Sequence, residues 1–443
     1  MDQKGSGMDE LAALAGEISG LSAMRIWGRI YAILGGTVEI KGLSDHAAIG
    51  DRVLIVTGSG RRIGAEVVAL RDRITTVLPE GSADGVAVGN RARLIGALEI
   101  APHDSWIGRI LDPSARPLDG QPLRRGGMAR PLRASPPPAA TRQRLGARLD
   151  TGLAVFNTLL PLVRGQRIGL FAGSGVGKSS LLAQMARGLT ADLVVIALVG
   201  ERGRELREFV ETVLGPEGMR RAIVVVATSD QPALVRRRCA LTAITIAEHF
   251  RDRGLHVLFL ADSVTRFAEA HREIAVAGGE APSLRGYPPS TSGAIMTLAE
   301  RTGPGPEGAG DITAVFTVLV AGSDMDEPVA DILRGTLDGH VVMDRAIAER
   351  GRFPAIDVLR SVSRSLPGAA SDAENALIAQ ARRLLGAYAG AEMMVRAGLY
   401  TPGADPVVDR AIAVWPALDA FVGESGDVAA SFARLAECLG EPG

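Results

Sequence analysis

The sequence predicts an α/β protein whose parallel sheet is preceded by a small β-barrel and followed by an α-helical domain. Three observations predict this fold. Beyond Arg164, nearly continuous apolar runs alternate with amphipathic stretches; before residue 98 the runs are short and β-rich; after Arg364, strand signals stop. Strands that are apolar on both faces need cover on both sides, which indicates a mostly parallel sheet between two layers of helices. The five central runs are 168–172, 193–199, 222–227, 257–261 and 312–320.

The composition is that of a globular protein. Of 443 residues, 47% are hydrophobic and 22% are charged, which excludes general disorder and fits two or three domains. The 49 basic and 50 acidic residues leave a formal net charge of −1, so no overall field draws the chain to nucleic acid or to an anionic membrane. Cys239 and Cys438 are too few for a disulfide scaffold, and neither a signal peptide nor a membrane-spanning run is recognisable. We therefore expect a cytosolic protein.

The N-terminal part is expected to hold a short helix and then a barrel. Residues 8–22 carry apolar side chains at three- and four-residue spacings, which predicts an amphipathic helix that docks on its own domain or on a partner. Gly35 and Gly36 suit a tight hairpin between two of the β-rich runs that follow. Short strands at this spacing favour a small sandwich or barrel, and the lack of an aromatic and basic stacking set favours a role in assembly over nucleic-acid binding. The runs are 29–34, 37–40, 53–56, 65–70 and 74–78.

Two further segments have a distinct composition. Residues 123–148 contain seven arginines, no acidic residue and three consecutive prolines, which favours an extended, solvated linker over a nucleic-acid patch. Near the C-terminus, Asp405 and Pro406 form an N-cap and first-turn pair that opens a helix.

A glycine-rich segment, Ala-Gly-Ser-Gly-Val-Gly-Lys-Ser at 172–179, lies between a predicted strand and a predicted helix. In that setting successive backbone N–H groups curl round a phosphate, and the helix N-terminus adds a favourable dipole. Lys178, one of only three lysines in the chain, is expected to reach the β- and γ-phosphates, and Ser179 to hold Mg²⁺. A mere flexible turn is the alternative, and a dinucleotide-binding fingerprint fails because Lys178 takes the place of the third glycine. The expected nucleotide-binding residues are Gly173, Ser174, Gly175, Val176, Gly177, Lys178, Ser179 and Ser180.

Two carboxylates are expected at the same edge of the sheet. Asp262 ends the run 257–261, where it would hold a magnesium-bound water, although taken alone it is equally suited to cap a helix. Glu201 follows the run 193–199, where a carboxylate can position the attacking water of a hydrolysis. The alternative for Glu201 is a surface ion-pair cluster, since Glu and Arg alternate at 201–205. Arg364 ends the segment Ser-Val-Ser-Arg. It could be an internal ion-pair partner or an arginine finger that reaches the nucleotide of a neighbouring subunit, and residue spacing does not decide between these two roles.

Taken together in this order, these segments resemble the rotary-type ATPases that share the core of the catalytic subunit of ATP synthase, and more narrowly the ATPases of the bacterial flagellar type III export apparatus. The resemblance implies a RecA/F1-like ATPase core at 99–369, a barrel at 23–98, an extension at 1–22 and a helical domain at 370–443. It extends over nearly the whole chain, through 108–112, 116–120, 171–180, 199–205, 227–230, 232–234, 262–266, 285–290, 326–331, 337–340 and 353–364.

The resemblance also implies roles for single residues. Lys178, Ser179 and Asp262 would act at ATP and Mg²⁺, Glu201 would activate water with Arg202 beside it, and Arg364 would act in trans. One chain then holds every catalytic part, which implies a homohexamer with sites at subunit interfaces. Relatives often carry an adenine-stacking aromatic some ten residues past the finger. Since 366–376 contains no aromatic residue, Tyr400 is the nearest candidate.

The family further implies a set of partners and a location: a dimeric negative regulator on the N-terminal helix, a coiled-coil stalk protein, a membrane export gate, and export substrates with their chaperones. The chain would be cytoplasmic and peripherally attached at the export apparatus, with no specific nucleic acid. Alternatives are the ATPase of a virulence type III secretion system, a subunit of ATP synthase, an RNA translocase of the termination-factor type, and a structural protein that does not hydrolyse ATP. Trp27 and Tyr31 are the only aromatics at 23–94, which disfavours an RNA-reading barrel.

Overall fold

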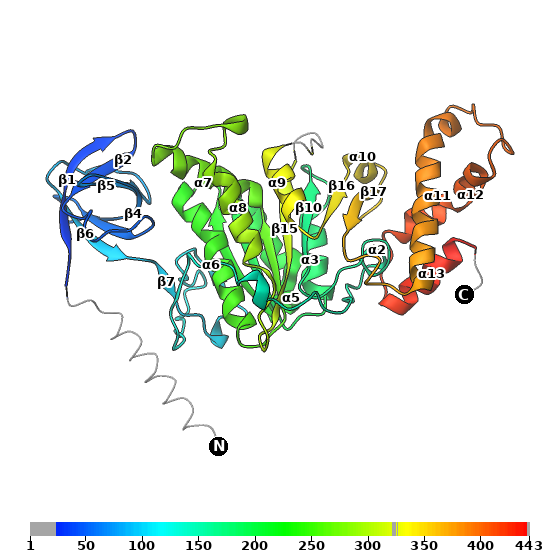
Figure 1. Ribbon diagram of the computed structural model, residues 1–443, viewed down its shortest axis with the longest axis horizontal. Coiled ribbons are helices and arrows are strands. Elements are labelled where there is room, and N and C mark those ends of the chain that lie inside the picture. The colour runs from blue at the N-terminus through cyan, green and yellow to red at the C-terminus, as the bar shows by residue number, and fades with distance from the viewer. Residues whose placement is uncertain (1–23, 321–324, 326, 441–443) are drawn as a thin grey trace, which may run out of the picture.

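The computed structural model describes residues 24–320, 325 and 327–440. Three bodies follow one another along its longest axis: a β-barrel, a sheet covered by helices, and a group of helices at the C-terminal end (Figure 1). The predicted order of barrel, α/β core and helical domain is therefore confirmed. The helix predicted at 8–22 lies outside the described residues.

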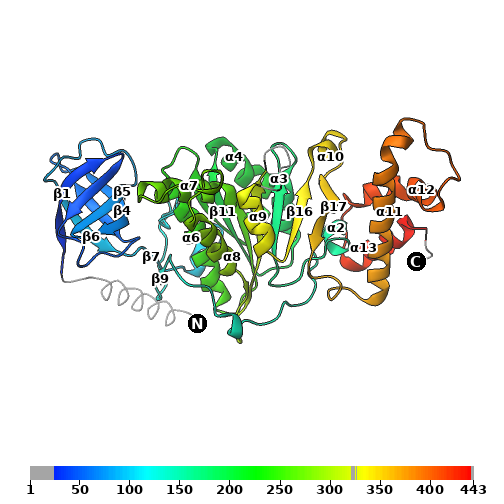
Figure 2. The same cartoon turned by 45° about the horizontal axis from the view of Figure 1, so that its top comes forward.

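The barrel is closed by six antiparallel strands in the order β1-β2-β5-β4-β3-β6 (Figure 2). Side chains alternate between its interior and the solvent, so that Ile30, Val38, Ile40, Val53 and Ile55 form the centre of its apolar core. All five predicted strands are present, and a sixth, β6, completes the ring. The strands are β1 (Trp27–Leu34), β2 (Thr37–Lys41), β3 (Arg52–Val56), β4 (Arg62–Arg71), β5 (Ile74–Pro79) and β6 (Arg91–Gly96).

The core is a nine-stranded sheet in the order β17-β16-β10-β15-β13-β11-β12-β8, with β14 beside β15. All five predicted runs are parallel neighbours in it, whereas β17 and β14 pair in antiparallel fashion. β16 and β17 were not predicted; β17 lies at the edge of the sheet and mixes buried with exposed side chains, which weakens its pattern. The strands are β8 (Ile110–Leu111), β10 (Arg167–Ala172), β11 (Leu193–Glu201), β12 (Ala222–Thr228), β13 (Val257–Asp262), β14 (Gly303–Pro304), β15 (Asp311–Leu319), β16 (Gly339–Met343) and β17 (Ile356–Ser363); β7 (Glu99–Ile100) and β9 (Arg130–Pro131) form a separate pair.

Helices cover both faces of the sheet, as the apolar strands require. Along β11 the buried side chains alternate between two apolar clusters: Val194, Ile196 and Leu198 meet the face of α3, while Val195 and Ala197 meet the face of α6 to α9. The first face carries α2 (Ala154–Asn157), α3 (Lys178–Gly188), α4 (Gly203–Glu208), the π-helical turn η3 (Phe209–Leu214), α5 (Gly215–Met219) and α10 (Arg345–Glu349). The second face carries α6 (Ala233–Arg251), α7 (Val264–Ala277), α8 (Ser290–Glu300) and α9 (Pro328–Thr336). Short 3₁₀ turns are η1 (Asp104–Trp106), η2 (Ala139–Thr141) and η4 (Leu284–Gly286).

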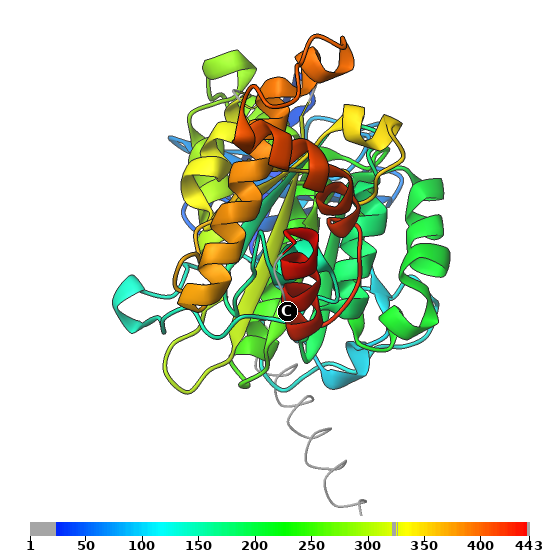
Figure 3. The ribbon, with the colours of Figure 1, turned by 90° about the vertical axis from the view of Figure 1, so that its right-hand side faces the viewer.

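The C-terminal body consists of α11 (Asp372–Arg396), α12 (Pro406–Phe421) and α13 (Val428–Cys438), and it faces the viewer in Figure 3. Each helix begins at a side-chain cap. Ser371 and Glu374 form a reciprocal capping box, and Asp427 accepts from Ala430 N. Asp405 accepts from the backbone of α12 with Pro406 in the first turn, which confirms the predicted helix start.

The arginine-rich segment 123–148 is extended and mostly exposed, as its composition favoured, but it is more than a linker. Four of its arginines form ion pairs with carboxylates of all three bodies, because an extended segment that crosses the molecule brings its cations to each surface in turn. Arg133 pairs with Glu66 of the barrel at 2.7 Å and Arg148 with Glu374 of α11 at 2.7 Å. Between them, Arg130 and Arg142 pair with the core, at Asp252 and Glu300. The segment therefore ties the three bodies together.

Candidate active site

Most of the site residues predicted from the sequence meet at the carboxyl edge of the parallel sheet. The strands β10, β11, β13 and β15 all end there, and the loop after β10 leads directly into α3. A cavity of about 910 Å³ opens at this edge. It is lined by Gly173, Ser174, Gly175, Gly177, Lys178, Ser179, Ser180, Glu201, Arg202, Glu205, Ser229, Arg236, Thr265, Arg266, Glu269 and Glu327, among others.

The loop 173–177 has the backbone that a phosphate cradle needs. Gly175 and Gly177 adopt φ of 78° and 85°, a region that side chains with a Cβ rarely enter. Gly177 also caps α3, so the free N–H groups of that helix face the cavity. Val176 differs from its neighbours because its side chain is buried in the apolar core, which anchors the loop and leaves only its backbone for a ligand.

A lysine and two carboxylates form the centre of the site. The Lys178 ammonium contacts Asp262 Oδ1 and lies 3.6 Å from Glu201 Oε1. Asp262 is only 3% exposed, and its carboxylate also accepts a hydrogen bond of 2.6 Å from the Thr317 hydroxyl. Asp262 is not a helix cap, since Ser263 caps α7. The carboxyl edge of the sheet thus holds two acids and one compact cation.

The carboxyl group of Glu201 is tuned by its surroundings. Burial raises its pKa above the ordinary value of 4.5; the Lys178 ammonium opposes this shift, while the nearby charges of Asp262 and Glu205 add to it. A raised pKa is what a carboxylate needs to accept a proton near neutral pH. Arg202, in contrast, is 77% exposed in its side chain and pairs with Glu205 at 3.6 Å. The surface ion-pair interpretation therefore fits Arg202 and Glu205, and not Glu201.

Sequence reasoning missed two side chains at the site. Arg266 lines the cavity, is held by Glu269 at 2.8 Å, and has its pKa raised chiefly by that hydrogen bond, with a further contribution from Glu201. It lies four residues past Asp262, in the first turn of α7, so its place just after the strand that ends at Asp262 could have revealed it. Phe353 packs on the phosphate loop: a Cβ on Gly177 would lie only 3.2 Å from Phe353 Cδ1. Its approach joins segments far apart in the sequence, and local spacing carries no signal for it.

Two predicted residues are not brought to this cavity. The Arg364 backbone N–H bonds Asp338 O at 3.0 Å, and Asp338 in turn holds Arg167 at the start of β10, so Arg364 lies at the opposite end of the sheet from the phosphate loop. Its side chain is exposed and donates to Arg334 O at 3.2 Å. Tyr400 is not among the residues that line the cavity, and its hydroxyl donates to Asp409 Oδ1 at 2.9 Å.

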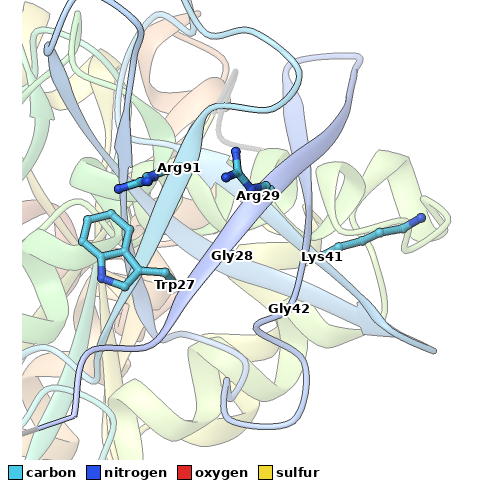
Figure 4. A pocket seen from close by; sticks show the side chains of 6 residues that line it. All are labelled: Trp27, Gly28, Arg29, Lys41, Gly42 and Arg91. Carbon is cyan, nitrogen blue, oxygen red and sulfur yellow. The ribbon is translucent and has the colours of Figure 1, made fainter.

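A second cavity, of about 530 Å³, lies on the outside of the barrel (Figure 4). Three cations, Arg29, Lys41 and Arg91, surround it together with the Trp27 indole. Tyr31 is not a further platform, because the Lys41 ammonium lies 3.5 Å from the centre of its ring. Proteins that bind single-stranded nucleic acid stack successive bases on several aromatics, and one indole does not supply such a series.

Within the described part of the chain, no group of three or more His, Cys, Asp or Glu side chains is placed to hold a metal ion. No helix there is long and apolar enough to cross a membrane.

Comparison with known proteins identifies the family. The nucleotide-binding domain of the ATP synthase alpha/beta family matches residues 152–363, and the C-terminal domain of the type III secretion ATPase EscN matches residues 370–441. A flagellum-specific ATP synthase of Caulobacter vibrioides is 47% identical over 439 residues, which cover 97% of this chain and 99% of the relative. The chain belongs to the ATP synthase alpha/beta family.

Other members of the alpha/beta family place the chain more narrowly. The flagellum-specific ATP synthase of Salmonella typhimurium is 40% identical, with 91% of this chain and 90% of the relative covered. A type 3 secretion system ATPase of Sinorhizobium fredii is 42% identical over 91% of this chain and 89% of the relative. The assembled EscN of enteropathogenic E. coli has a TM-score of 0.84 at 35% identity, covering 93% of this chain and all of that one, and EscN in complex with its central stalk EscO gives the same TM-score at 36% identity. The predicted family resemblance is confirmed.

Proposed function

We propose that this chain is the ATPase of the flagellar type III export apparatus, which hydrolyses ATP with Mg²⁺ as a homohexameric, protein-translocating enzyme. One observation carries the hydrolytic activity: beside a phosphate loop, the Lys178 ammonium lies between the buried carboxylate of Asp262 and the partly buried carboxylate of Glu201. The flagellar assignment is supported by relatives of that type at 40 to 47% identity over about nine-tenths of the chain. The ATPase of a virulence secretion system is the related alternative.

The residues of the cavity suggest how ATP is bound and hydrolysed. The backbone N–H groups of the loop and the Lys178 ammonium bind the β- and γ-phosphates, and Lys178 leaves its carboxylate partners to do so. Glu201 then orients the attacking water and accepts its proton. The Arg266 guanidinium, at the rim of the same cavity, neutralises the charge that develops on the γ-phosphate. Arg202 lines the cavity beside Glu201, and we keep it among the proposed catalytic residues.

The site also suits a magnesium ion. Ser179 lines the cavity, and Asp262 presents a buried carboxylate that already faces a cation, the Lys178 ammonium. These are oxygen ligands, which Mg²⁺ prefers, and two protein ligands suffice because Mg²⁺ usually keeps several waters and substrate phosphates. When bound between Ser179 and Asp262, the ion would neutralise phosphate charge.

An aromatic side chain for the adenine base is also part of the proposal. Tyr400 was the candidate from sequence, but its hydroxyl is engaged within the helical domain. Phe353 lies against Gly177 and is 54% exposed, so an aromatic face is available beside the nucleotide loop. We assign the stacking role to Phe353.

The ring and its partners follow from the same family. We propose four parts of the chain: an N-terminal extension at 1–22 that binds a regulator dimer, the barrel at 23–98, the ATPase core at 99–369 and the helical domain at 370–443. The ring that these chains form is cytoplasmic and is attached peripherally below a membrane export gate. There the ring receives export substrates and their chaperones. A relative assembles with a central stalk protein. The exposed Met393, Met394 and Leu399 at the end of α11 offer an apolar surface for such a stalk.

A mixing experiment tests the proposal. Lys178→Ala removes the phosphate-binding cation and keeps the finger; Arg364→Ala removes the finger and keeps the phosphate loop. Each variant alone should lose ATP hydrolysis, and equimolar mixtures should regain part of it, because mixed rings contain interfaces with both intact parts. Recovery absent at every mixing ratio would overturn the finger in trans, and full activity of Lys178→Ala would overturn the site. A rate that rose many-fold with single-stranded RNA would instead favour the RNA translocase.

A further inference from the structure

The segment that carries Phe353 touches two bodies at once. It connects α10 to β17, and the Phe353 ring packs on Gly177 of the phosphate loop. Its backbone packs on the helical domain: a Cβ on Gly423, just past α12, would lie 2.6 Å from Phe353 O. One residue therefore spans the gap between the nucleotide loop and the C-terminal helices.

Arg352, the residue before it, holds this segment in shape. Its Nη1 and Nη2 atoms donate to Pro354 O and Ile356 O, each at 2.8 Å, so one guanidinium bonds the backbone on the far side of Phe353. Its Nε atom lies 3.1 Å from Asp419 Oδ1 on α12. The Arg352 side chain is 12% exposed, and a shielded ion pair of this kind is weakened little by solvent or salt.

We infer that the Arg352–Asp419 ion pair couples the position of the helical domain to the nucleotide affinity of the phosphate loop. Arg352 and Asp419 are positioning residues, which act through Phe353 and do not touch the substrate. A displacement of α12 pulls on the guanidinium, which moves the backbone at 352–356 and with it the ring on Gly177. By thermodynamic reciprocity, nucleotide bound at the loop favours one position of the helical domain. This inference rests on the proposed ATPase function and adds to it a route for regulation through the C-terminal helices.

A second ion pair in the chain serves as a matched control. Arg350 comes from the same segment and pairs with Glu392 of α11 at 3.3 Å, so it also joins the segment to the helical domain. The two side chains of this pair are about one-third exposed, and the Arg350 guanidinium donates to Glu392 instead of bonding to the backbone as Arg352 does. An ion pair that is exposed to this extent contributes little to stability. If attachment to the helical domain were all that mattered, both pairs would behave alike.

The experiment uses the full-length chain with Asp419→Asn, Arg352→Lys and the control Glu392→Gln. Steady-state hydrolysis gives KM and kcat for ATP, and titration with a fluorescent ADP analogue gives its Kd. Asp419→Asn should raise KM and Kd together by about fivefold or more, the lower range of measured coupling energies, with kcat at saturating ATP nearly unchanged. Arg352→Lys keeps the charge but not the two carbonyl bonds, and should show the same split. Glu392→Gln should match the wild type.

Unchanged KM and Kd in Asp419→Asn would overturn the inference, and so would an equal rise in Glu392→Gln. If circular dichroism shows that Asp419→Asn is poorly folded, Phe353→Leu replaces it, since the Phe353 side chain is half exposed. Phe353→Leu and Arg352→Lys then form a double-mutant cycle. Additive effects of the two substitutions on Kd would overturn the coupling, and non-additive effects would support it. A wild-type chain that binds the analogue without hydrolysing ATP would refute the proposed function, and the Kd comparison would still decide the coupling.

Discussion

Replacing Glu201 by glutamine separates a catalytic carboxylate from a structural one. Glutamine keeps the size of the side chain and its reach into the cavity, but it cannot accept a proton from water. Removing a general base typically costs 10² to 10⁴ in rate, equivalent to about 3 to 5 kcal/mol of barrier at about 1.36 kcal/mol per factor of ten. We expect Glu201→Gln to lose ATP turnover by this factor while it still binds nucleotide, because the phosphate loop and Lys178 are untouched.

Stability gives a second readout of opposite sign. Burial is the main reason that the pKa of Glu201 is raised, so the folded protein disfavours its ionised form. Glutamine removes that charge, and Lys178 keeps Asp262 as its closer partner. The melting temperature of Glu201→Gln should therefore equal or exceed that of the wild type. A carboxylate whose role was an ion pair would show the reverse: a loss of stability with turnover retained.

The assay is coupled phosphate release at saturating ATP, with the Kd of a fluorescent nucleotide measured in parallel. Glu205→Gln is the matched control, since Glu205 lines the same cavity and forms an ion pair with the exposed Arg202. It should keep turnover within about threefold, in line with the small energy of an exposed pair. Glu201→Gln that retained more than a tenth of wild-type turnover, or Glu205→Gln with an equal loss, would refute the assignment of the base.

Three other outcomes test separate features. Because burial raises the pKa of Glu201 above 4.5 and only the ionised form accepts a proton, kcat/KM should fall as the pH drops through that raised pKa; a rate still flat at about pH 4.5 would contradict this. Glu248→Gln leaves the guanidinium of Arg301, which is 1% exposed, without its carboxylate partner. The free energy of unfolding in urea titrations should therefore fall by about 3 to 5 kcal/mol, whereas replacing both residues by apolar ones should not lower it by this amount. Tyr400→Ala should leave KM for ATP within about twofold of the wild-type value in steady-state assays. A larger rise in KM would restore Tyr400 as the residue that stacks on adenine.

The sequence predicted the parts of this molecule whose causes are local. The central strands are apolar on both faces, and every such run became a parallel strand. The phosphate loop was recognisable because glycine is required where φ is positive, as at Gly175 and Gly177. Glu201 and Asp262 could be placed at one edge because parallel strands end together. Caps such as Asp405 also depend only on neighbours.

The missed features depend on contacts between distant segments. β17 alternates its burial because it is an edge strand, so its pattern is weak. Phe353 meets Gly177 only after the whole sheet is assembled. The ion pairs of the arginines at 123–148 were missed because their acidic partners, such as Glu66 and Glu374, lie elsewhere in the sequence. No local pattern encodes these pairings, and an excess of one charge in a segment says little until its partners are known.

The position of Arg364 makes assembly a condition of catalysis. β10 has six residues, and at about 3.3 Å per residue it separates the start of the strand, where Arg364 lies, from the phosphate loop by roughly 20 Å. That is several times the reach of an arginine side chain, so Arg364 cannot serve the Lys178 of its own chain. An exposed arginine at the far edge of the sheet is instead available to a neighbouring subunit. If Arg364 is the finger, the specific activity must rise with protein concentration as rings form, and a monomer must bind ATP far better than it hydrolyses it.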